Sequence, residues 1–405
     1  MFFNLNEFLV SVSFALDFIE MDFLGVPSNH GKRVAYIALK LSEMLNLSKE
    51  EKYDLVSLSI LHDNGIAEVF SREELATEGI GVLKSNEDIK EHCIIGEKNA
   101  EAYPFFTDAT NVIKYHHEKY DGTGFFNVKG DDIPLMSQII FIANDIEHKF
   151  KDTGVTYNIK SKIMNYVSAE KGKSYSPKIV EVFSNLCEEE SFWENLKDVN
   201  IRPYLSNNTP SFIKTLSLKE ISRITKVMSK IIDSKSEFTE IHSNELSDKA
   251  AIMADFYKMP EDEKDKLIIA ADLHDIGKLA ISNKILDKPA KLTKEEFEVI
   301  KEHVRYTRVA LEQISGFEDI TEWAANHHEK LNGSGYPLGK TVEDLDFNSR
   351  LMGCLDIYQA LVEERPYRKS LTHEEAMKIM VNMQENNLID KNIVTDINIV
   401  FKGKK

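Results

Sequence analysis

Apolar residues recur three or four positions apart along most of this 405-residue chain, which is the spacing of one face of an α-helix. The segments "RVAYIALKLSEML" (33–45) and "DKLIIAADLHD" (265–275) are typical. The first 25 residues have the same spacing but carry four acidic side chains, so they predict a core helix rather than a signal peptide or a membrane span. No segment alternates apolar and polar residues convincingly enough for a strand. The pattern therefore predicts an all-α protein.

Local signals predict where some of these helices begin. A Ser or Thr followed three positions later by Glu is typical of a capping box, in which each side chain accepts a hydrogen bond from the other residue's backbone. This arrangement predicts helix starts at Ser48, Thr293 and Thr372.

A break in the pattern predicts the domain boundary. The segment "NIRPYLSNNTP" (200–210) has two prolines and three asparagines, which interrupt helices and favour turns. A long helix is predicted to follow from "LSLKEISRITKVMSKIID" (216–233). We therefore expect two tandem helical bundle domains, residues 1–199 and 213–405, joined by a linker at residues 200–212.

The two halves repeat one pattern of histidines and aspartates. Matching positions are 211 or 212 residues apart, and ten of the chain's twelve histidines belong to the pattern. Scattered core histidines would not keep such a register, so the repeat indicates two related domains with related sites. The first copy consists of His30, His62, Asp63, His92, His116, His117 and Asp145, and the second of His242, His274, Asp275, His303, His327, His328 and Asp356.

These residue types suit a metal site. Imidazole nitrogens together with carboxylate oxygens bind Mn, Fe, Zn, Co or Ni. One carboxylate among several histidines can bridge two ions, and ions about 3.5–4 Å apart serve many phosphoester hydrolases. A single His on an apolar helix face is more often a buried core residue than a ligand. Seven matched residues in each copy favour metal binding over that explanation.

Composition narrows the range of partners. The net charge of −17 makes a poor surface for DNA or RNA, so a phosphate ligand needs a local cationic site. The three cysteines are scattered and form no CxxC pair, which fits a reducing cytoplasm. No segment approaches a membrane span. We therefore expect a cytoplasmic protein that has neither a nucleic-acid polymer nor a membrane as its partner.

The second half resembles the HD-GYP domains, a branch of the HD phosphohydrolase superfamily. The matching segments are "HDIGK" (274–278), His303, "HHE" (327–329), "GSGYP" (333–337), Asp356 and "RPYR" (365–368). They cover nearly all of the second half, and the first half resembles the same domain in degenerate form. The resemblance implies a helical bundle that hydrolyses cyclic dinucleotides, usually cyclic di-GMP, at a bi- or trinuclear metal site. Some tandem members are similar to phosphodiesterases for 3',3'-cyclic GMP-AMP.

The resemblance also implies the metal ligands. One ion would be held by His242, His274, Asp275 and Asp356. The other would be held by Asp275, His303, His327 and His328, with Asp275 bridging the two. Trinuclear members usually carry a Glu four residues before the first His, where this chain has Phe238, so two divalent ions are expected. Family habit favours Mn or Fe, with Zn, Co and Ni compatible, and the first copy is a candidate for a second pair.

Cationic side chains and the Gly-Tyr-Pro loop are the candidate substrate-binding groups. Lys278 follows the His-Asp pair by one helical turn, within reach of a phosphate oxygen. Arg365 and Arg368 resemble the family's phosphate-binding pair, and their structural alternative is a solvated helix end. Gly335 permits close backbone approach. Tyr336 is expected to contact a nucleotide or a partner protein, or to brace the loop.

Two positions depart from the family pattern. Asn332 stands where an Asp is usual, and "DIYQAL" has Gln359 where a second Asp is usual. Neither is a metal ligand by the motif. Both bear on substrate choice or on loop anchoring.

The first copy keeps every matched ligand but loses the cations. "HDIGK" becomes "HDNGI", so Ile66 stands where the second copy has Lys278. "GYP" becomes "GFF", and Gly154 stands opposite Arg365. We therefore expect the second copy to perform the chemistry, with Asp275 and Lys278 as its catalytic residues. The first copy would hold metal structurally, regulate, or act on a different substrate.

The leading hypothesis is a metal-dependent phosphodiesterase in which a hydroxide activated by two ions opens a cyclic dinucleotide. Cyclic di-GMP is the first expectation for the substrate and 3',3'-cyclic GMP-AMP the next. The product would be a linear dinucleotide, with mononucleotides after a second cut. The alternatives are a non-catalytic sensor of cyclic dinucleotides or of metal redox state, and another HD phosphohydrolase acting on nucleotides. Regulation would come from the first copy, a homodimer or a signalling-protein partner.

Overall fold

The computed structural model divides the chain into two compact units, which are described separately. The N-terminal unit is Asn4–Lys214, and the C-terminal unit is Thr215–Lys405 together with Met1–Phe3. A few side chains within helices, that of His242 among them, are not described. The structure describes the backbone of all residues except 25–28, 70–85, 151–156, 235–241, 287, 289, 364–368 and 404–405.

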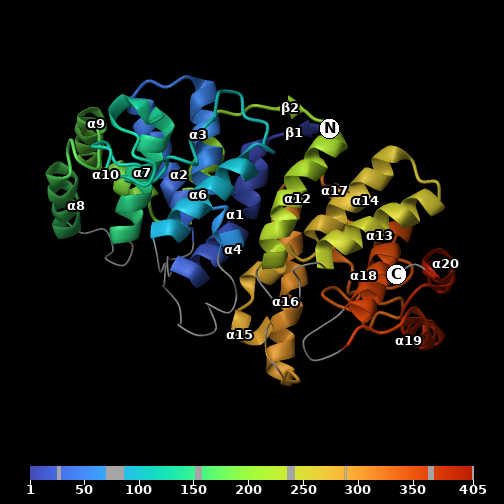
Figure 1. Ribbon diagram of the computed structural model, residues 1–405. Coiled ribbons are helices and arrows are strands. Elements are labelled where there is room, and N and C mark those ends of the chain that lie inside the picture. Colours follow the sequence, from blue (N-terminus) through green and yellow to red (C-terminus); the bar gives the residue numbers. More distant parts are fainter. Residues whose placement is uncertain are drawn as a thin grey trace. The chain divides into compact units, whose positions relative to one another are not determined.

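The N-terminal unit is built mainly of helices, joined by turns and loops (Figure 1). Its long helix α2 packs against α3 and α7, and α6 packs on α3 and α4. The elements are α1 (Leu5–Leu24), α2 (His30–Met44), α3 (Lys49–Leu61), α4 (Ile66–Val69), α6 (Asn86–Ala100), the 3-10 helix η1 (Gly130–Asp132), α7 (Leu135–Phe150), α8 (Tyr157–Ala169), α9 (Pro177–Cys187), α10 (Glu190–Asn195) and α11 (Asp198–Asn208).

The C-terminal unit repeats this plan. Helix α14 packs on α12, α13, α17 and α18, and α16 packs on α17 and on the short 3-10 helix η2. The elements are β1 (Phe2–Phe3), β2 (Lys214–Thr215), α12 (Leu218–Ser234), α13 (His242–Phe256), α14 (Glu261–Leu273), η2 (Ile276–Ala280), α15 (Asn283–Leu286), α16 (Lys294–Leu311), α17 (Glu318–Ala325), α18 (Phe347–Val362), α19 (His373–Glu385) and α20 (Lys391–Phe401).

The all-α prediction is confirmed. Two-residue strands β1 and β2, which pair with each other, are the only strands among the described residues. The N-terminal segment forms helix α1, whose apolar face is buried as predicted at Leu5, Phe8, Leu9, Val12 and Leu16. Within the described part of the chain, no helix is long and apolar enough to cross a membrane.

The three predicted capping boxes are confirmed. In α3, α16 and α19 the capping hydroxyl accepts a hydrogen bond from the backbone N–H three residues later, and the Glu at that position accepts one in return. These reciprocal bonds satisfy two backbone donors that would otherwise lack partners at a helix start. The capping residues are Ser48, Thr293 and Thr372.

The predicted linker at residues 200–212 differs from the structure. Helix α11 covers most of it, with Pro203 inside the helix, and the chain passes to the C-terminal unit after Lys214. A proline within a helix costs about 3 kcal/mol. Ile201 and Leu205 are almost fully buried in the N-terminal unit, where α11 packs on α2 and α10. Tertiary burial therefore outweighs the local helix-breaking signal.

Candidate metal centres

Helix ends bring together the ligands predicted for the C-terminal unit. His274 terminates α14, and Asp275 follows it at the start of η2. Among the ligands whose side chains are described, all but the partly exposed His328 are at least nine-tenths buried, so the cluster lies inside the helical bundle. The other described ligands come from three further helices or their ends: His303 (α16), His327 and His328 (after α17) and Asp356 (α18).

Asp275 lies between two groups of histidines. Its Oδ1 is 3.4 Å from Nε2 of His303 and 4.0 Å from Nε2 of His327. Its Oδ2 is 3.0 Å from Nε2 of His274. Donor atoms of His274, Asp275 and His327 lie within 4.8 Å of one another, as do those of His303, His327 and His328. The predicted bridging position of Asp275 is consistent with this geometry.

Backbone carbonyls orient the histidine rings. In each of His274, His303 and His327, Nδ1 lies 2.5–2.7 Å from the carbonyl oxygen three residues earlier. Because a carbonyl only accepts, Nδ1 must donate, and the lone pair of each ring is then on Nε2, which faces Asp275. Holding the distal nitrogen in this way is typical of metal-ligating histidines.

The cluster fits divalent metal. Two ligand atoms that each lie about 2.1 Å from one ion, with a ligand–metal–ligand angle of about 90–110°, are about 3.0–3.4 Å apart. The distances from the Asp275 oxygens to Nε2 of His274 and of His303 have these values. Among the described residues, Nε2 of His303 and of His327 and Oδ1 of Asp275 have no hydrogen-bond partner although they are buried. Buried polar atoms without partners are costly, and metal coordination would satisfy them.

The electrostatics of the cluster keep the ligands in their binding forms. Burial lowers the pKa of His303 to about 4 and that of His327 to about 3, so both imidazoles are neutral at pH 7. Burial opposes the ionisation of Asp275, but the neighbouring His274 and Lys278 outweigh it and hold its pKa well below the usual range. A neutral imidazole and an ionised carboxylate are the forms that bind metal.

The remaining predicted ligands lie at the edge of this cluster. Asp356 Oδ1 is 3.9 Å from Nε2 of His274, and its Oδ2 is 3.8 Å from Nδ1 of His328. His242 is the first residue of α13, and its side chain lies outside the described set, as do Arg365 and Arg368 entirely.

The N-terminal unit builds a comparable cluster. Asp63 Oδ1 is 3.2 Å from Nε2 of His92 and 3.4 Å from Nε2 of His116, and Oδ2 is 3.3 Å from Nε2 of His62. Nδ1 of His62 and of His116 lies 2.9 Å and 2.5 Å from the carbonyl oxygen three residues earlier, as in the C-terminal unit. His30 joins His62 and Asp63 in a group whose donor atoms lie within 4.8 Å of one another.

Asp145, the remaining predicted ligand of the first copy, is engaged elsewhere. Its Oδ2 accepts hydrogen bonds from the hydroxyls of Tyr166 and Tyr175, and its Oδ1 pairs with Lys149 at 2.8 Å. Both carboxylate oxygens of Asp145 are therefore engaged, and the structure does not offer them as metal ligands to the cluster formed by the other six residues. Nothing in the spacing of the repeat distinguishes Asp145 from Asp356, so the difference arises from side chains packed around it.

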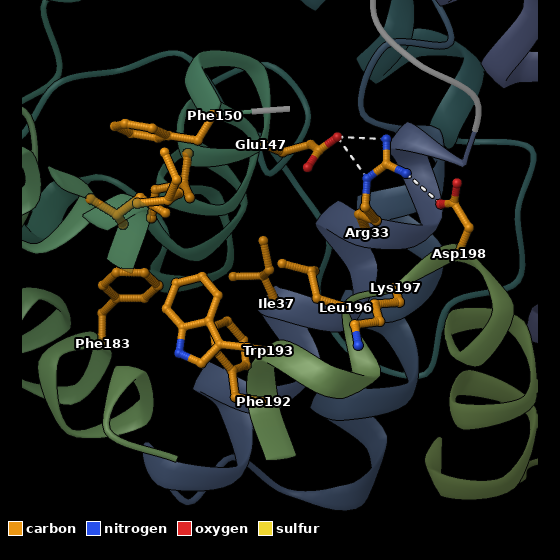
Figure 2. A pocket seen from close by; sticks show the side chains of 13 residues that line it. Arg33, Ile37, Glu147, Phe150, Phe183, Phe192, Trp193, Leu196, Lys197 and Asp198 are labelled. Carbon is orange, nitrogen blue, oxygen red and sulfur yellow. Dashed lines mark hydrogen bonds and ion pairs between the residues drawn. The ribbon is translucent and has the colours of Figure 1, made fainter. Parts of the chain in front are cut away.

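Glu147 takes a place beside the N-terminal cluster that the sequence did not predict. Its Oε1 is 3.6 Å from Nδ1 of His30 and 2.7 Å from Nη2 of Arg33. Arg33 also pairs with Asp198 at 2.6 Å, so it lies between two carboxylates (Figure 2). These charges form the polar side of a cavity of about 400 Å³, and its other side is apolar and includes Phe183 and Trp193.

A glycine after each His-Asp pair allows two elements to pack closely. A Cβ on Gly277 would lie 1.9 Å from the carbonyl oxygen of His303, and a Cβ on Gly65 would lie 2.3 Å from that of His92. In the C-terminal unit the hydroxyl of Thr307 links the two elements. It accepts a hydrogen bond from the Gly277 N–H and donates one to the His274 carbonyl. The glycine in "HDIGK" and "HDNGI" therefore lets the histidine-bearing helices α16 and α6 approach the His-Asp pair.

The Glu of each "HHE" segment anchors the loop that follows it. Glu329 accepts hydrogen bonds from the backbone N–H groups of Leu338 and Lys340 at 2.7 and 2.9 Å. Glu118 does the same for Phe126 and Val128, both at 2.8 Å. The two patterns differ by one residue because Pro337 stands at the position of Phe126 and has no N–H to donate. This anchoring role was not predicted.

The loop side chains lie against the cluster. The ring centroid of Tyr336 is 4.9 Å from that of His328, and Nζ of Lys301 lies over the tyrosine ring, 5.6 Å from its centroid. Asn332 Oδ1 accepts from both the N–H and the hydroxyl of Ser334, and Gln359 donates to Glu245 at 2.8 Å. The structure thus gives Asn332 a part in loop anchoring.

Lys278 points at the carboxylate of Asp275. Its Nζ is 2.6 Å from Oδ2 of Asp275, and the side chain is 23% exposed. A cation so placed can contact both the cluster and a bound anion. Ile66 occupies the equivalent place in the N-terminal unit and is almost fully buried, so that position carries no charge in place of the lysine.

These features together define a tandem HD domain protein with a His/Asp centre in each unit. The chain belongs to the HD domain family, whose model matches residues 22–179 and 226–393. Its second copy carries the HD-GYP signature, and its first copy is a degenerate form of the same domain.

Some similar proteins match nearly the whole chain, and others match one part of it. A 3'3'-cGAMP-specific phosphodiesterase 1 of Vibrio cholerae serotype O1 is 28% identical over 385 residues, which cover 93% of this chain and 87% of that protein. A crystal structure of a cyclic GMP-AMP specific phosphodiesterase from V. cholerae is 27% identical, with a TM-score of 0.69, and covers 100% of this chain and 99% of that chain. A probable cyclic di-GMP phosphodiesterase of V. cholerae is 38% identical over 148 residues, 34% of each chain.

Proposed function

We propose that this protein is a metal-dependent phosphodiesterase that hydrolyses a cyclic dinucleotide in its C-terminal unit. The observation that carries the proposal is the buried Asp275, which lies between two histidine groups and beside a lysine. The three similar proteins described above are named as phosphodiesterases, which agrees with this chemistry.

The reaction consumes one water. A new P–O bond forms, the bond between phosphorus and a ribose 3' oxygen breaks, and that oxygen takes up a proton. Two divalent ions, when bound, acidify water and compensate the phosphate charge. The ligands proposed for them are His242, His274, Asp275, His303, His327, His328 and Asp356.

The protein's own groups bind and orient the diester. Lys278 would move from Asp275 to a non-bridging phosphate oxygen, where it stabilises charge that grows in the transition state. The backbone at Gly335 and the ring of Tyr336 would border the nucleotide, and Arg365 and Arg368 would hold its second phosphate. These cations supply the local positive charge that the net charge of −17 does not provide.

Coverage favours 3'3'-cGAMP as the substrate, ahead of cyclic di-GMP. The relative named for 3'3'-cGAMP matches 93% of this chain, including both units. Relatives named for cyclic di-GMP match between 28% and 45% of it. A linear dinucleotide would be the first product, and the reaction would take place in the cytoplasm.

The alternative is a receptor that binds a cyclic dinucleotide without turnover. The N-terminal unit has a cluster of histidines around Asp63 but no lysine at the position of Ile66, and this combination fits binding more than hydrolysis. We therefore assign turnover to the C-terminal unit only. A receptor would retain the ligand unchanged, so product analysis separates the two functions.

The test is a product assay under anaerobic conditions with Mn- or Fe-loaded protein, with 3'3'-cGAMP and cyclic di-GMP offered separately. Asp275→Ala and Asp63→Ala form a matched pair, because each removes the central carboxylate of one unit. We expect linear product from the wild type and from Asp63→Ala, and loss of at least about 100-fold in Asp275→Ala. Absence of product from fully metal-loaded wild type with both substrates would overturn the proposal.

A further inference from the structure

The N-terminal cluster contains a thiol that the repeat does not account for. Cys93 follows His92 in α6 and is fully buried. Its Sγ lies 3.6 Å from Nε2 of His92 and 3.9 Å from Nδ1 of His116. One donor atom from each of four residues lies within 4.8 Å of all the others: His92, Cys93, His116 and His117.

The corresponding group in the C-terminal unit contains only histidines. Its members are His303, His327 and His328, and the residue that matches Cys93 is Val304, which is also fully buried. A valine in that position shows that the fold needs only a small apolar side chain there. The thiol in the N-terminal unit is therefore an addition to the ligand set rather than a packing requirement.

The spacing of the donor atoms suits one tetrahedral ion. With bonds of about 2.3 Å to sulfur and about 2.0–2.1 Å to nitrogen, a sulfur and a nitrogen ligand lie about 3.5 Å apart. The Cys93 sulfur and the His92 nitrogen are 3.6 Å apart. Nε2 of His116 is buried and has no hydrogen-bond partner among the described residues.

We propose that the N-terminal unit holds a mixed histidine–thiolate metal centre in which Cys93 is a ligand, and that this centre selects a zinc-class ion and does not hydrolyse phosphate. Thiolate is a soft ligand that favours Zn²⁺ over Mn²⁺, whereas the nitrogen and oxygen donors of the C-terminal unit do not make that selection. Binding replaces the S–H bond by a metal–sulfur bond and releases the proton to solvent.

Two features argue against hydrolysis at this centre. A thiolate donates more charge to the ion than an imidazole does, and four protein donors leave no open position of the kind that catalytic zinc sites keep. Ile66 also stands where the C-terminal unit has Lys278. The two units would thus hold chemically different ions within one chain.

Cobalt substitution tests the proposal without relying on activity. A thiolate bound to Co²⁺ gives an intense charge-transfer absorption in the near ultraviolet, and imidazole and carboxylate ligands do not. The metal-free full chain would be titrated anaerobically with CoCl₂ while spectra and bound cobalt are recorded. The wild type is compared with Cys93→Val, which copies Val304 of the C-terminal unit, and with Cys93→Ser. Cys187→Ser is the matched control, because Cys187 is a buried cysteine of the same unit outside the cluster.

We expect the charge-transfer band in the wild type and in Cys187→Ser, and its loss in both Cys93 variants. Circular dichroism confirms that the valine variant is folded. The proposal is overturned if the wild type binds cobalt with no such band, or if the band persists in Cys93→Val. Either result would leave the Cys93 sulfur as a hydrogen-bonding neighbour of His92 and His116. Phosphodiesterase activity, measured separately, bears on the C-terminal unit and not on this outcome.

Discussion

At the scale of single residues, Lys278 is the main chemical difference between the two units. It contacts the carboxylate of Asp275 in the C-terminal unit, and its counterpart Ile66 is apolar. We expect Lys278→Ala to lower kcat about 10²–10³-fold, as the loss of one charge-stabilising group does, with metal content unchanged. Lys278→Arg should recover part of the rate. Lys266→Ala removes a surface pair with Asp319 and serves as the control. Unchanged kcat in Lys278→Ala would contradict a catalytic role.

The low pKa values of the ligands predict how metal binding responds to acid. At pH 5.5 an imidazole with a pKa of about 4 (His303) or about 3 (His327) is still neutral, and Asp275 is ionised. Protons therefore compete with metal only as the pH falls toward 4. We expect the affinity of the C-terminal centre for Mn²⁺ to change less than about tenfold between pH 7.5 and 5.5.

The measurement is chelator competition in an Asp63→Ala/His92→Ala/His116→Ala background, which removes the central donors of the N-terminal cluster, so that binding reports the C-terminal unit. Three histidines with the ordinary pKa of about 6.5 would instead lose affinity about a thousand-fold over this range. A loss of that size would mean that the imidazoles are not held neutral by burial.

At the scale of elements, the close approach of η2 to α16 depends on Gly277. A Cβ there would lie 1.9 Å from a backbone carbonyl, which cannot move aside as a flexible side chain could. We expect Gly277→Ala to destabilise the protein by about 1–3 kcal/mol and to weaken metal binding by displacing His303. Gly31→Ala is the control, since its nearest neighbours are 3.6 Å away and α2 gains helix propensity. Thermal unfolding and metal analysis measure both effects.

The anchored loop gives a second prediction at this scale. Glu329 holds the Gly-Tyr-Pro loop through two backbone N–H groups, and Glu118 holds the equivalent loop in the N-terminal unit. We expect Glu329→Gln to lower kcat/KM about 10–100-fold while metal content stays constant, because it loosens a substrate-binding loop and removes no ligand. Glu118→Gln should leave kcat/KM unchanged. Equal effects of the two substitutions would refute the assignment of turnover to one unit.

At the scale of the whole molecule, charge opposes the proposed substrate. A net charge of −17 repels an anionic dinucleotide at low salt, where the Debye length is about 30 Å, but much less at 0.15 M, where it is about 8 Å. We expect kcat/KM to rise as ionic strength increases from about 0.01 to 0.15 M, with kcat constant, since encounter is affected and chemistry is not. Steady-state kinetics at fixed free metal measure this. A falling kcat/KM would show that the cations near Lys278 dominate the long-range field.

The sequence by itself determined the helical class, the tandem repeat, the three capped helix starts and most of the cluster. Each of these depends on local spacing or on a register that the repeat makes visible. The buried core of α1 and the cluster around Asp275 agree with those predictions.

Only the tertiary structure decided the rest, because it depends on contacts between residues far apart in the chain. Burial of Ile201 and Leu205 keeps α11 helical across Pro203. Hydroxyls of Tyr166 and Tyr175 engage Asp145, although its spacing matches that of a ligand. Packing of α6 brings Cys93 beside His116, 23 residues away, and no pattern in the sequence indicated that contact.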